Sequence, residues 1–349
     1  FMREATAPVV GITGSNAKST VTSLVGAMAL KSSINVGVGG NLGTPALDLL
    51  DPARELYVLE LSSFQLERAG NLGLAVATVL NVSADHLDRH GSMPAYHQAK
   101  HRIFRGCRKA VVNRDDPLTI PLLAPGIEVT SWRLGEPELE GFGLRIIDGQ
   151  ECLSRGFEAL MPVDEIGMPG RHNIANALAA LALGYSAGLQ IEDMLASLRS
   201  FRGLPHRCQQ VAVIEGVRYV DDSKGTNIGA TEAALAGLGG ERDLVLIAGG
   251  QAKGADFSVL RQAVDRHCNT LVLIGEDADL LEQALGDCLP VVRAHSMAEA
   301  VTAAAGHASP GDTVLLSPAC ASFDMFSGYV ARGEAFQQAV LDLAGGKDE

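Results

Sequence analysis

The sequence lacks paired cysteines and long apolar runs. Its six cysteines are scattered along 349 residues with no C-x-x-C spacing, which argues against a disulfide framework and against a cysteine zinc site. No apolar run approaches the roughly eighteen residues that a membrane span needs, and the N-terminus has no secretion-signal pattern. We therefore expect a soluble protein of the reducing cytoplasm, with no membrane partner.

Positive charge is also scarce. Lysine and arginine total 28 against 41 aspartate and glutamate residues, so the net charge is -13. Such a field repels phosphate backbones at long range, which argues against a nucleic-acid partner. An acidic chain still binds anionic small molecules where cations, helix N-termini or metal ions gather locally.

Length and pattern predict two domains of the α/β class. The chain has 349 residues, 47% of them hydrophobic, and short β-branched runs alternate with helix-length stretches in both halves. We expect a P-loop-type central domain with a mostly parallel sheet over residues 1–203 and a Rossmann-like domain over 204–349. Glycine and proline at 201–205 mark the linker. Glycine-rich breaks over 128–161 predict antiparallel strands added to the first sheet.

The first predicted strand, residues 8–13, leads into Gly14-Ser15-Asn16-Ala17-Lys18-Ser19-Thr20 and then a helix. This order is typical of a phosphate cradle, in which backbone N–H groups and the helix dipole face the anion, a lysine reaches the terminal phosphates and a hydroxyl holds Mg²⁺. Ile12 and Ala17 stand where a P-loop usually has glycine, so a plain strand-to-helix turn is the alternative. If Ala17 needs a positive φ, its Cβ costs about 1 kcal/mol.

Polar residues also follow the next predicted strands. Glu60 lies at the end of the strand 56–61, and another strand leads into 81–88, which contains His86. The carboxyl ends of parallel strands border the ligand crevice, so a carboxylate there can hold a metal ion. Each residue has a plainer interpretation: Glu60 as a solvated acid, His86 as an N-cap neighbour or surface residue, and Lys100 as part of a solvated helix face.

Together these segments resemble the Mur ligases, ATP-dependent enzymes that form amide bonds in peptidoglycan precursor synthesis. The resemblance rests on collinear segments at 13–20, 36–41, 59–66, 80–89, 170–180, 203–207, 221–227, 249–257 and 315–324. Within the family, Glu-Leu-Ser-Ser-Phe-Gln at 60–65 and Ser-Pro-Ala-Cys-Ala-Ser at 317–322 indicate the branch that adds D-glutamate to UDP-N-acetylmuramoyl-L-alanine. The resemblance implies that the substrate carboxylate takes the γ-phosphate of ATP and that the D-glutamate amine then attacks the acyl phosphate.

The resemblance also implies roles for single residues. The catalytic group would be Lys18, Glu60, His86 and Lys100, with ATP bound by residues 14–20. One Mg²⁺ would rest on Ser19 and Glu60, and a second on His86 and on Lys100 carried as a carbamate, because a free ammonium cannot ligate a cation. Further nucleotide contacts are expected from Asn173, Asn176, Arg207, Asp222 and Lys224, although Asn173 fits helix capping nearly as well. Substrate contacts are expected from Asn41, Thr226, Lys253, Ser322 and Tyr329.

The chain departs from the family pattern in several places. Gln251-Ala252 stands where Asp-Gly is common, Gly225 where alanine is common, and Tyr329 where phenylalanine is usual. Few residues precede the phosphate loop, so we expect the central and C-terminal domains without the UDP-binding domain, a monomer, and weak ligation because remote binding energy is lost. The alternatives are an ATP-binding regulatory or scaffold module without ligase activity, and a ligase like the folylpolyglutamate synthetases.

Overall fold

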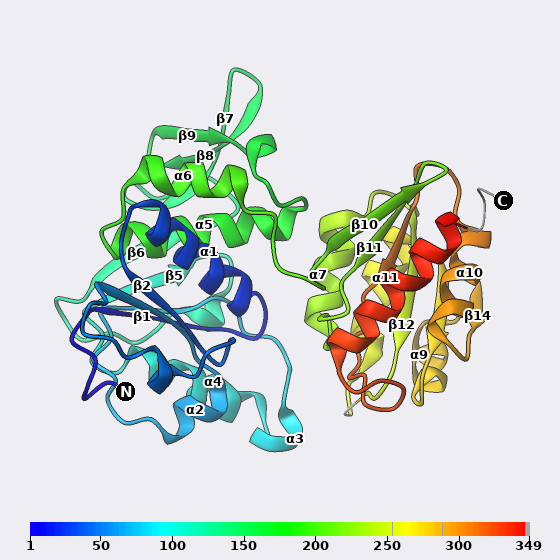
Figure 1. Cartoon of the computed structure of the whole chain (residues 1–349), viewed down its shortest axis with the longest axis horizontal. Helices are drawn as coiled ribbons and strands as arrows, with labels where there is room; N and C mark the ends of the chain where they lie inside the picture. The colour runs from blue at the N-terminus through cyan, green and yellow to red at the C-terminus, as the bar shows by residue number, and fades with distance from the viewer. Residues whose placement is uncertain (253, 288, 346–349) are drawn as a thin grey trace. The chain divides into compact units, whose positions relative to one another are not determined.

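The computed structural model describes residues 1–252, 254–287 and 289–345. These form two compact units, one of Phe1–Pro169 with Asn173–Gly203 and the other of Gly170–His172 with Leu204–Glu349 (Figure 1). Each unit has helices on both faces of a mostly parallel sheet, so the predicted α/β fold class is confirmed. Among the helices of the described ranges, none has the length and apolarity that crossing a bilayer requires.

The first unit is built on a nine-stranded sheet of order β2-β3-β1-β4-β5-β6-β7-β8-β9. The pairs from β2 through β7 are parallel, whereas β7–β8 and β8–β9 are antiparallel. The strands are β1 (Val9–Thr13), β2 (Val36–Gly40), β3 (Leu56–Glu60), β4 (Val76–Val79), β5 (Lys109–Asn113), β6 (Glu128–Trp132), β7 (Phe142–Ile147), β8 (Gln150–Arg155) and β9 (Glu158–Pro162).

The segment 128–161 departs in part from the prediction. β7, β8 and β9 form the expected antiparallel strands, with the turn Asp148-Gly149 between the first two, both residues at positive φ. β6, however, pairs parallel with β5, so the prediction of antiparallel strands was wrong there. The connection over 114–127 is long enough for the crossover that a parallel pair needs, and no tight turn joins these two strands.

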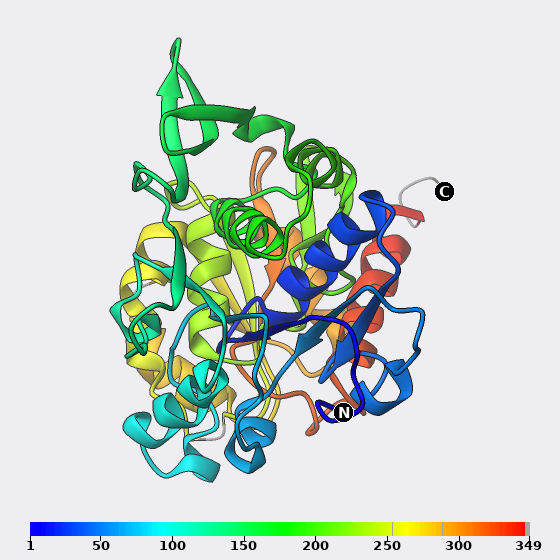
Figure 2. The same cartoon turned by 90° about the vertical axis from the view of Figure 1, so that its left-hand side faces the viewer.

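Helices cover both faces of the first sheet (Figures 1 and 2). Alternation along β1 directs Val10 and Ile12 toward α1, α5 and α6, whereas Val9 packs with residues of α2 and α4. The helices are α1 (Lys18–Lys31), α2 (Ser63–Arg68), α3 (Leu87–His90), α4 (Met93–His101), α5 (Arg171–Ser186) and α6 (Ile191–Ser200). The short 3₁₀ turns are η1 (Ala46–Leu49), η2 (Arg102–Phe104), η3 (Pro117–Thr119) and η4 (Val163–Glu165).

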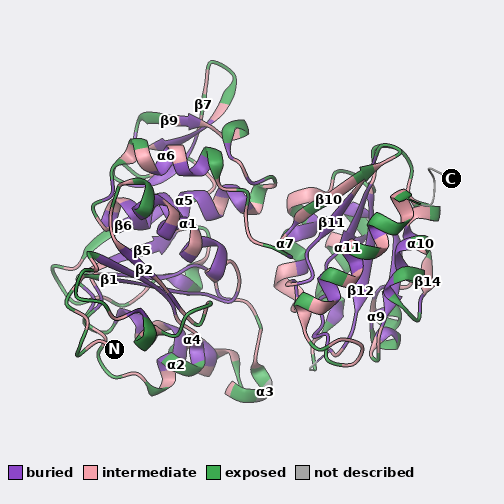
Figure 3. Cartoon of the chain, viewed as in Figure 1, coloured by how far each residue is buried: buried purple, intermediate pink, exposed green. Residues whose placement is uncertain are grey.

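The second unit has a six-stranded sheet of order β10-β11-β15-β12-β13-β14, parallel except for the β10–β11 hairpin. Two apolar clusters cover the two faces of this sheet, one under α7, α8 and α9 and the other under α10 and α11. Figure 3 shows the strands of the sheet as buried and the helices beside them as partly exposed. Its elements are β10 (Gln209–Ile214), β11 (Val217–Asp221), α7 (Ile228–Leu238), β12 (Leu244–Gly249), η5 (Phe257–Leu260), α8 (Arg261–His267), β13 (Cys268–Ile274), α9 (Ala278–Leu285), β14 (Val291–Arg293), α10 (Met297–His307), β15 (Thr313–Leu316) and α11 (Tyr329–Gly345).

Candidate functional site

The loop after β1 leads directly into α1, as the sequence predicts. Lys18 is the first helical residue, and its Nζ folds back to donate to the carbonyl oxygens of Gly14 (2.8 Å) and Ser15 (2.9 Å). Asn81, which follows β4, accepts from the Asn16 N–H through Oδ1 (2.8 Å) and holds the loop in place. The first turn of a helix carries positive partial charge, so this loop is suited to an anion. Ser19 and Thr20 are buried in that turn.

Ala17 is the N-cap of α1 and has φ 66, in the left-handed region, as anticipated for a position where glycine is usual. We predict that Ala17→Gly is neutral or stabilises by up to about 1 kcal/mol, since relief of Cβ strain outweighs or balances the added entropy of the unfolded chain. In Ala29→Gly, a fully buried position within α1, the same change should destabilise by about 1 kcal/mol or more. Urea unfolding measures both, and equal losses would contradict the strain argument.

Lys100 lies at the same loop and is 1% exposed, so the interpretation as a solvated helix face is wrong. Its Nζ donates to the Gly14 carbonyl (2.7 Å), the acceptor that Lys18 also uses, and lies 4.4 Å from the Tyr96 ring centroid. Burial lowers the pKa of Lys100 well below its usual value, Lys18 lowers it further, and Asp85 and Glu60 act in the opposite sense. The lowered pKa increases the share of the neutral amine, the form that reacts with CO₂.

Glu60 ends β3 and is 2% exposed, so the interpretation as a solvated acid is also wrong. Asn41 Nδ2 donates to Glu60 Oε1 (2.8 Å), whereas Glu60 Oε2 is buried without a hydrogen-bond partner. A buried carboxylate oxygen that lacks a donor is suited to a cation. The backbone of Gly40, at φ 100, lies close to the backbone of Glu60. Only glycine fits there, because a Cβ would lie 2.5 Å from the Glu60 carbonyl oxygen.

His86 is the N-cap of α3 at φ 53, but its side chain makes no capping hydrogen bond. Its Nε2 lies 3.5 Å from Asp85 Oδ2, and the side chain is 41% exposed. The structure thus brings Lys18 and Lys100 to the same carbonyl oxygen, with Glu60 and Asp85 near enough for their charges to act on Lys100. His86 lies beside Asp85. Exposure of part of the imidazole leaves it accessible to a ligand.

A metal ion at the carboxyl ends of β1 and β3 would not meet a preformed cluster of carboxylate and imidazole ligands among the described residues. Within the described part of the chain, no group of three or more His, Cys, Asp or Glu residues is arranged to hold a metal ion. The predicted ligand set instead combines Glu60 and His86 with the Ser19 hydroxyl and Lys100. The orphaned oxygen of Glu60 and the favoured neutral amine of Lys100 fit that set.

The two asparagines of α5 lie deep in the first unit. Asn173 Nδ2 donates to the Pro169 carbonyl (2.7 Å), and Asn176 Nδ2 donates to Asn173 Oδ1 (3.0 Å). Asn173 is the third residue of the helix, and its oxygen accepts from a side chain instead of a first-turn N–H. The capping interpretation is therefore wrong, and one hydrogen bond joins the two amides.

In the second unit, Asp222 is buried and 7% exposed. Ser317 Oγ donates to its Oδ2 (2.8 Å) and the Cys208 N–H donates to its Oδ1 (3.2 Å). Burial raises the pKa of Asp222 to about 7, against the opposing effects of these donors and of Arg207. Asp222, which is itself a predicted nucleotide contact, therefore changes charge near neutral pH.

We predict that Asp222 makes the protein less stable as the pH rises. The Asp222 carboxyl keeps its proton in the folded state up to a pKa of about 7, whereas an ordinary aspartate releases it near 3.8. The stabilisation that this retained proton gives is therefore complete below pH 4 and is lost as the pH rises to 7. A pKa difference of about three units corresponds to about 4 kcal/mol in the free energy of unfolding. Urea unfolding between pH 4 and 8 should show this decline, Asp222→Asn should remove it, and Asp265→Asn, at an exposed ion pair, should keep it. An unchanged slope in Asp222→Asn would contradict the assignment.

Lys224 and Tyr329, two further predicted residues of the second unit, meet at the start of α11. Lys224 Nζ lies 4.0 Å from the centroid of the Tyr329 ring, and Ser223 Oγ donates to the Tyr329 carbonyl (2.8 Å). Ser322 is 2% exposed, and Thr226 is half-buried with its N–H bonded to the Lys224 carbonyl (2.8 Å). Lys253 lies outside the described residues.

Arg332 was not predicted, although it organises this region. It is 1% exposed, and its guanidinium donates to the carbonyl oxygens of Ser223 (2.9 Å) and Cys320 (3.1 Å). Burial lowers its pKa to about 10, which still leaves it charged. No local signal marks an arginine on a helix as buried. Tyr96 was missed as well, though its position four residues before Lys100 places both on one helix face.

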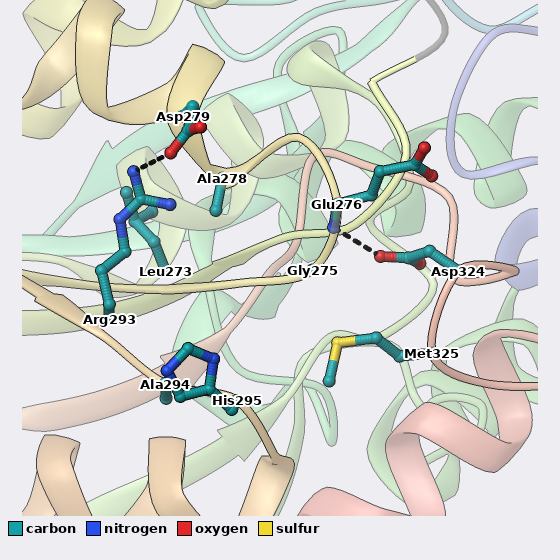
Figure 4. Close-up of a pocket in the computed structure, with 10 residues that line it drawn as sticks. All are labelled: Leu273, Gly275, Glu276, Ala278, Asp279, Arg293, Ala294, His295, Asp324 and Met325. Carbon is teal, nitrogen blue, oxygen red and sulfur yellow. Dashed lines mark hydrogen bonds and ion pairs between the residues drawn. The ribbon is translucent and has the colours of Figure 1, made fainter.

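A cavity of about 690 Å³ opens beyond the carboxyl ends of β13 and β14 (Figure 4). Asp324 Oδ2 accepts from the Glu276 N–H (2.9 Å) on one side, and Arg293 pairs with Asp279 Oδ1 (2.6 Å) on the other. Figure 4 shows His295 beside Ala294, on the same side of the cavity as Arg293. The cavity adjoins the loop that carries Ser322, and the sequence had not indicated it.

Two family models match this chain. The Mur ligase middle domain matches residues 12–184, and the model described as "Mur ligase, glutamate ligase domain" matches residues 206–320. Curated relatives share more than half of their aligned residues with it. The UDP-N-acetylmuramoylalanine--D-glutamate ligase of Pseudomonas syringae pv. syringae (strain B728a) is 58% identical over 346 residues, which cover 99% of this chain and 77% of the relative. The ligase of that name from Pseudomonas aeruginosa PAO1 is 57% identical with the same coverage.

Solved structures are similar at low identity. A pseudomurein peptide ligase type C from Methanothermus fervidus has TM-score 0.72 and 16% identity, covering 98% of this chain and 80% of that chain. The MurF ligase from Thermotoga maritima in complex with ADP has TM-score 0.70 and 19% identity, covering 97% and 81%. E. coli FolC in complex with DHPP and ADP has TM-score 0.69 and 20% identity, covering 98% and 89%. At these identities the similarity concerns the fold alone.

Proposed function

This chain belongs to the Mur ligase family, and we propose on that premise that it joins D-glutamate to UDP-N-acetylmuramoyl-L-alanine in peptidoglycan precursor synthesis. The reaction is that of an ADP-forming acid-amino-acid ligase. The strongest support for this function is the 58% identity, over 99% of the chain, with a UDP-N-acetylmuramoylalanine--D-glutamate ligase. The geometry of the phosphate loop supports it.

The first step activates a carboxylate. The L-alanyl carboxylate attacks the γ-phosphorus of ATP, the bond to the β-γ bridging oxygen breaks, and ADP leaves as an acyl phosphate forms. All reacting groups are anionic, so positioning and charge neutralisation dominate the rate. Lys18 and the first turn of α1 supply positive charge where the phosphates lie. We assign Asn41, whose side chain donates to Glu60, to the phosphate or acyl end.

Mg²⁺, when bound, neutralises the charge that develops on the transferred phosphoryl group. Ser19 and Glu60 would hold one ion, and His86 with Lys100 as a carbamate would hold the second. Glu60 offers an oxygen that has no other partner. The desolvated Lys100 amine would react with CO₂ to give an oxygen-bearing ligand in place of an ammonium.

The second step attaches the incoming amino acid. The D-glutamate amine attacks the acyl carbon, and the tetrahedral adduct expels inorganic phosphate. We assign Thr226, Lys253, Ser322 and Tyr329 to the dicarboxylate, since hydroxyl donors and a cation suit anion recognition. Nucleotide contacts fall to Asn173, Asn176, Arg207, Asp222 and Lys224. In this assignment the domain 1–203 binds ATP, the domain 204–349 binds the incoming amino acid, and the protein acts as a cytoplasmic monomer on small molecules.

Phosphate release tests this function. With ATP and Mg²⁺ present, release should require both UDP-N-acetylmuramoyl-L-alanine and D-glutamate, and L-glutamate should not replace the D-enantiomer. Release that depends on a pterin acceptor instead would favour the folylpolyglutamate-type ligase, whose solved relative shares the fold. Nucleotide binding without release under any acceptor would favour the regulatory or scaffold alternative.

A further inference from the structure

Helices α2 and α3 are joined by side chains that no step of the proposed reaction uses. The His90 side chain is 0% exposed, with Nε2 3.0 Å from Ser63 Oγ and Nδ1 3.2 Å from Glu67 Oε1. Arg89 lies 3.3 Å from the other Glu67 oxygen and over the Phe64 ring. We call Ser63, Phe64, Glu67, Arg89 and His90 the α2–α3 clasp. Two helices of one to two turns have little stability alone, so the clasp fixes their relative position.

The clasp reaches His86 on one side. Phe64 contacts both histidines, with its ring centroid 5.0 Å from that of His86 and 5.5 Å from that of His90. The His90 N–H also donates to the His86 carbonyl (3.0 Å), closing the single turn of α3. The position of the His86 imidazole therefore depends on how α3 is held against α2.

The clasp reaches the phosphate loop on its other side. The His90 ring packs on Tyr96, with 5.1 Å between centroids, and the Tyr96 hydroxyl is hydrogen bonded to Ser15 Oγ (3.1 Å). The face of the same tyrosine lies 4.4 Å from Lys100 Nζ. A displacement of His90 would therefore move the tyrosine that supports both Ser15 and Lys100.

The order Ser63–His90–Glu67 has the form of a nucleophilic triad, but it lacks the access that a nucleophile needs. Ser63 is 3% exposed, and the imidazole is fully enclosed by Phe64 and Tyr96. A substrate cannot reach the Ser63 oxygen. The cluster is therefore structural support for a neighbouring site.

We propose that His90 is a positioning residue of the phosphate site, which holds His86 on one side and the Tyr96 support of Ser15 and Lys100 on the other. This inference rests on the proposed function, since it takes His86 and Lys100 as holders of the second metal ion. Residues that orient metal-holding side chains affect metal affinity or activity about 10- to 100-fold when replaced. His90 should have an effect of that size without touching substrate.

The test compares His90→Phe, which keeps a ring on Phe64 but removes both nitrogens, with wild type. We expect kcat to fall about tenfold and the dissociation constant for Mn²⁺, measured by EPR with ADP present, to rise about fivefold or more. KM for ATP should change less, by about twofold, because Lys18 and the first turn of α1 keep their contacts and only the Tyr96 support of Ser15 is disturbed. His90→Gln, which returns a nitrogen toward Ser63, should recover most of the loss.

His97→Phe is the matched control, since His97 is a half-buried histidine of α4 that stacks on His101, away from the clasp. It should leave kcat and Mn²⁺ affinity unchanged. Wild-type values in a folded His90→Phe, or equal losses in both variants, would overturn the proposal. If His90→Phe does not fold, Glu67→Gln takes its place, and a Mn²⁺ affinity in that variant equal to that of His97→Phe would overturn the proposal. Failure of the proposed function would appear separately, as wild type that releases no phosphate with both substrates.

Discussion

Replacing Lys100 with alanine should abolish phosphoryl transfer, lowering kcat on the order of 10³-fold. The variant loses the amine that the proposed site carries as a carbamate, and with it one holder of the second metal ion. Small carboxylates such as acetate should restore part of the activity, because the lost side chain leaves room for an oxygen ligand beside Gly14. Steady-state kinetics with and without added carboxylate measure both effects.

The fold should survive this change. Lys100 is buried with a lowered pKa, so its removal takes away a desolvated amine, together with its hydrogen bond to the Gly14 carbonyl and its contact with the Tyr96 ring. Lys109→Ala is the control, since that lysine is half exposed and paired with Glu128 (3.2 Å) at the start of β5. Full activity in Lys100→Ala would remove Lys100 from the site. Loss of activity without carboxylate rescue would remove the carbamate alone.

Replacing Glu60 with glutamine should lower kcat on the order of 10²- to 10³-fold and raise the Mg²⁺ concentration needed for half-maximal activity about tenfold. The amide keeps the shape of the side chain and can still bond Asn41, but it carries no charge for a cation. The difference should therefore appear in the metal dependence, with little change in the melting temperature. Activity measured across a Mg²⁺ titration tests this expectation.

The control for Glu60 lies at the other end of the same strand. Glu55 is exposed and accepts from the Asn35 N–H (2.9 Å) through Oε2, so Glu55→Gln should leave the metal dependence unchanged. A Glu60→Gln enzyme with the wild-type Mg²⁺ requirement would contradict the assignment of the buried, unpartnered oxygen to a cation. An equal change in both variants would point to a general effect of lowered negative charge.

The sequence predicted what depends on local pattern. Residues 9–13 and 18–31 form the expected strand and helix, and Glu60 ends a buried parallel strand as the apolar run indicated. Parallel strands place their carboxyl ends at one edge, so a strand assignment is enough to gather these loops. The φ of 66 at Ala17 likewise follows from the loop type.

What the sequence did not predict depends on packing between distant elements. Lys100 and Arg332 are each 1% exposed, yet nothing adjacent to them in the chain distinguishes them from surface cations. His90 acquires its partners only when α3 meets α2, and its neighbours in the sequence are polar. The parallel pairing of β6 was missed for a related reason, because the partner of a strand after a long connection is a tertiary choice.

A structure of the chain with a non-hydrolysable ATP analogue and Mg²⁺ tests the central claim most directly. The account predicts the triphosphate at the first turn of α1, with Lys18 on its terminal phosphates, one metal ion on Glu60 and another beside His86 and a carbamate on Lys100. Phosphates bound elsewhere, or a metal ion that leaves Glu60 Oε2 unpartnered, would contradict it.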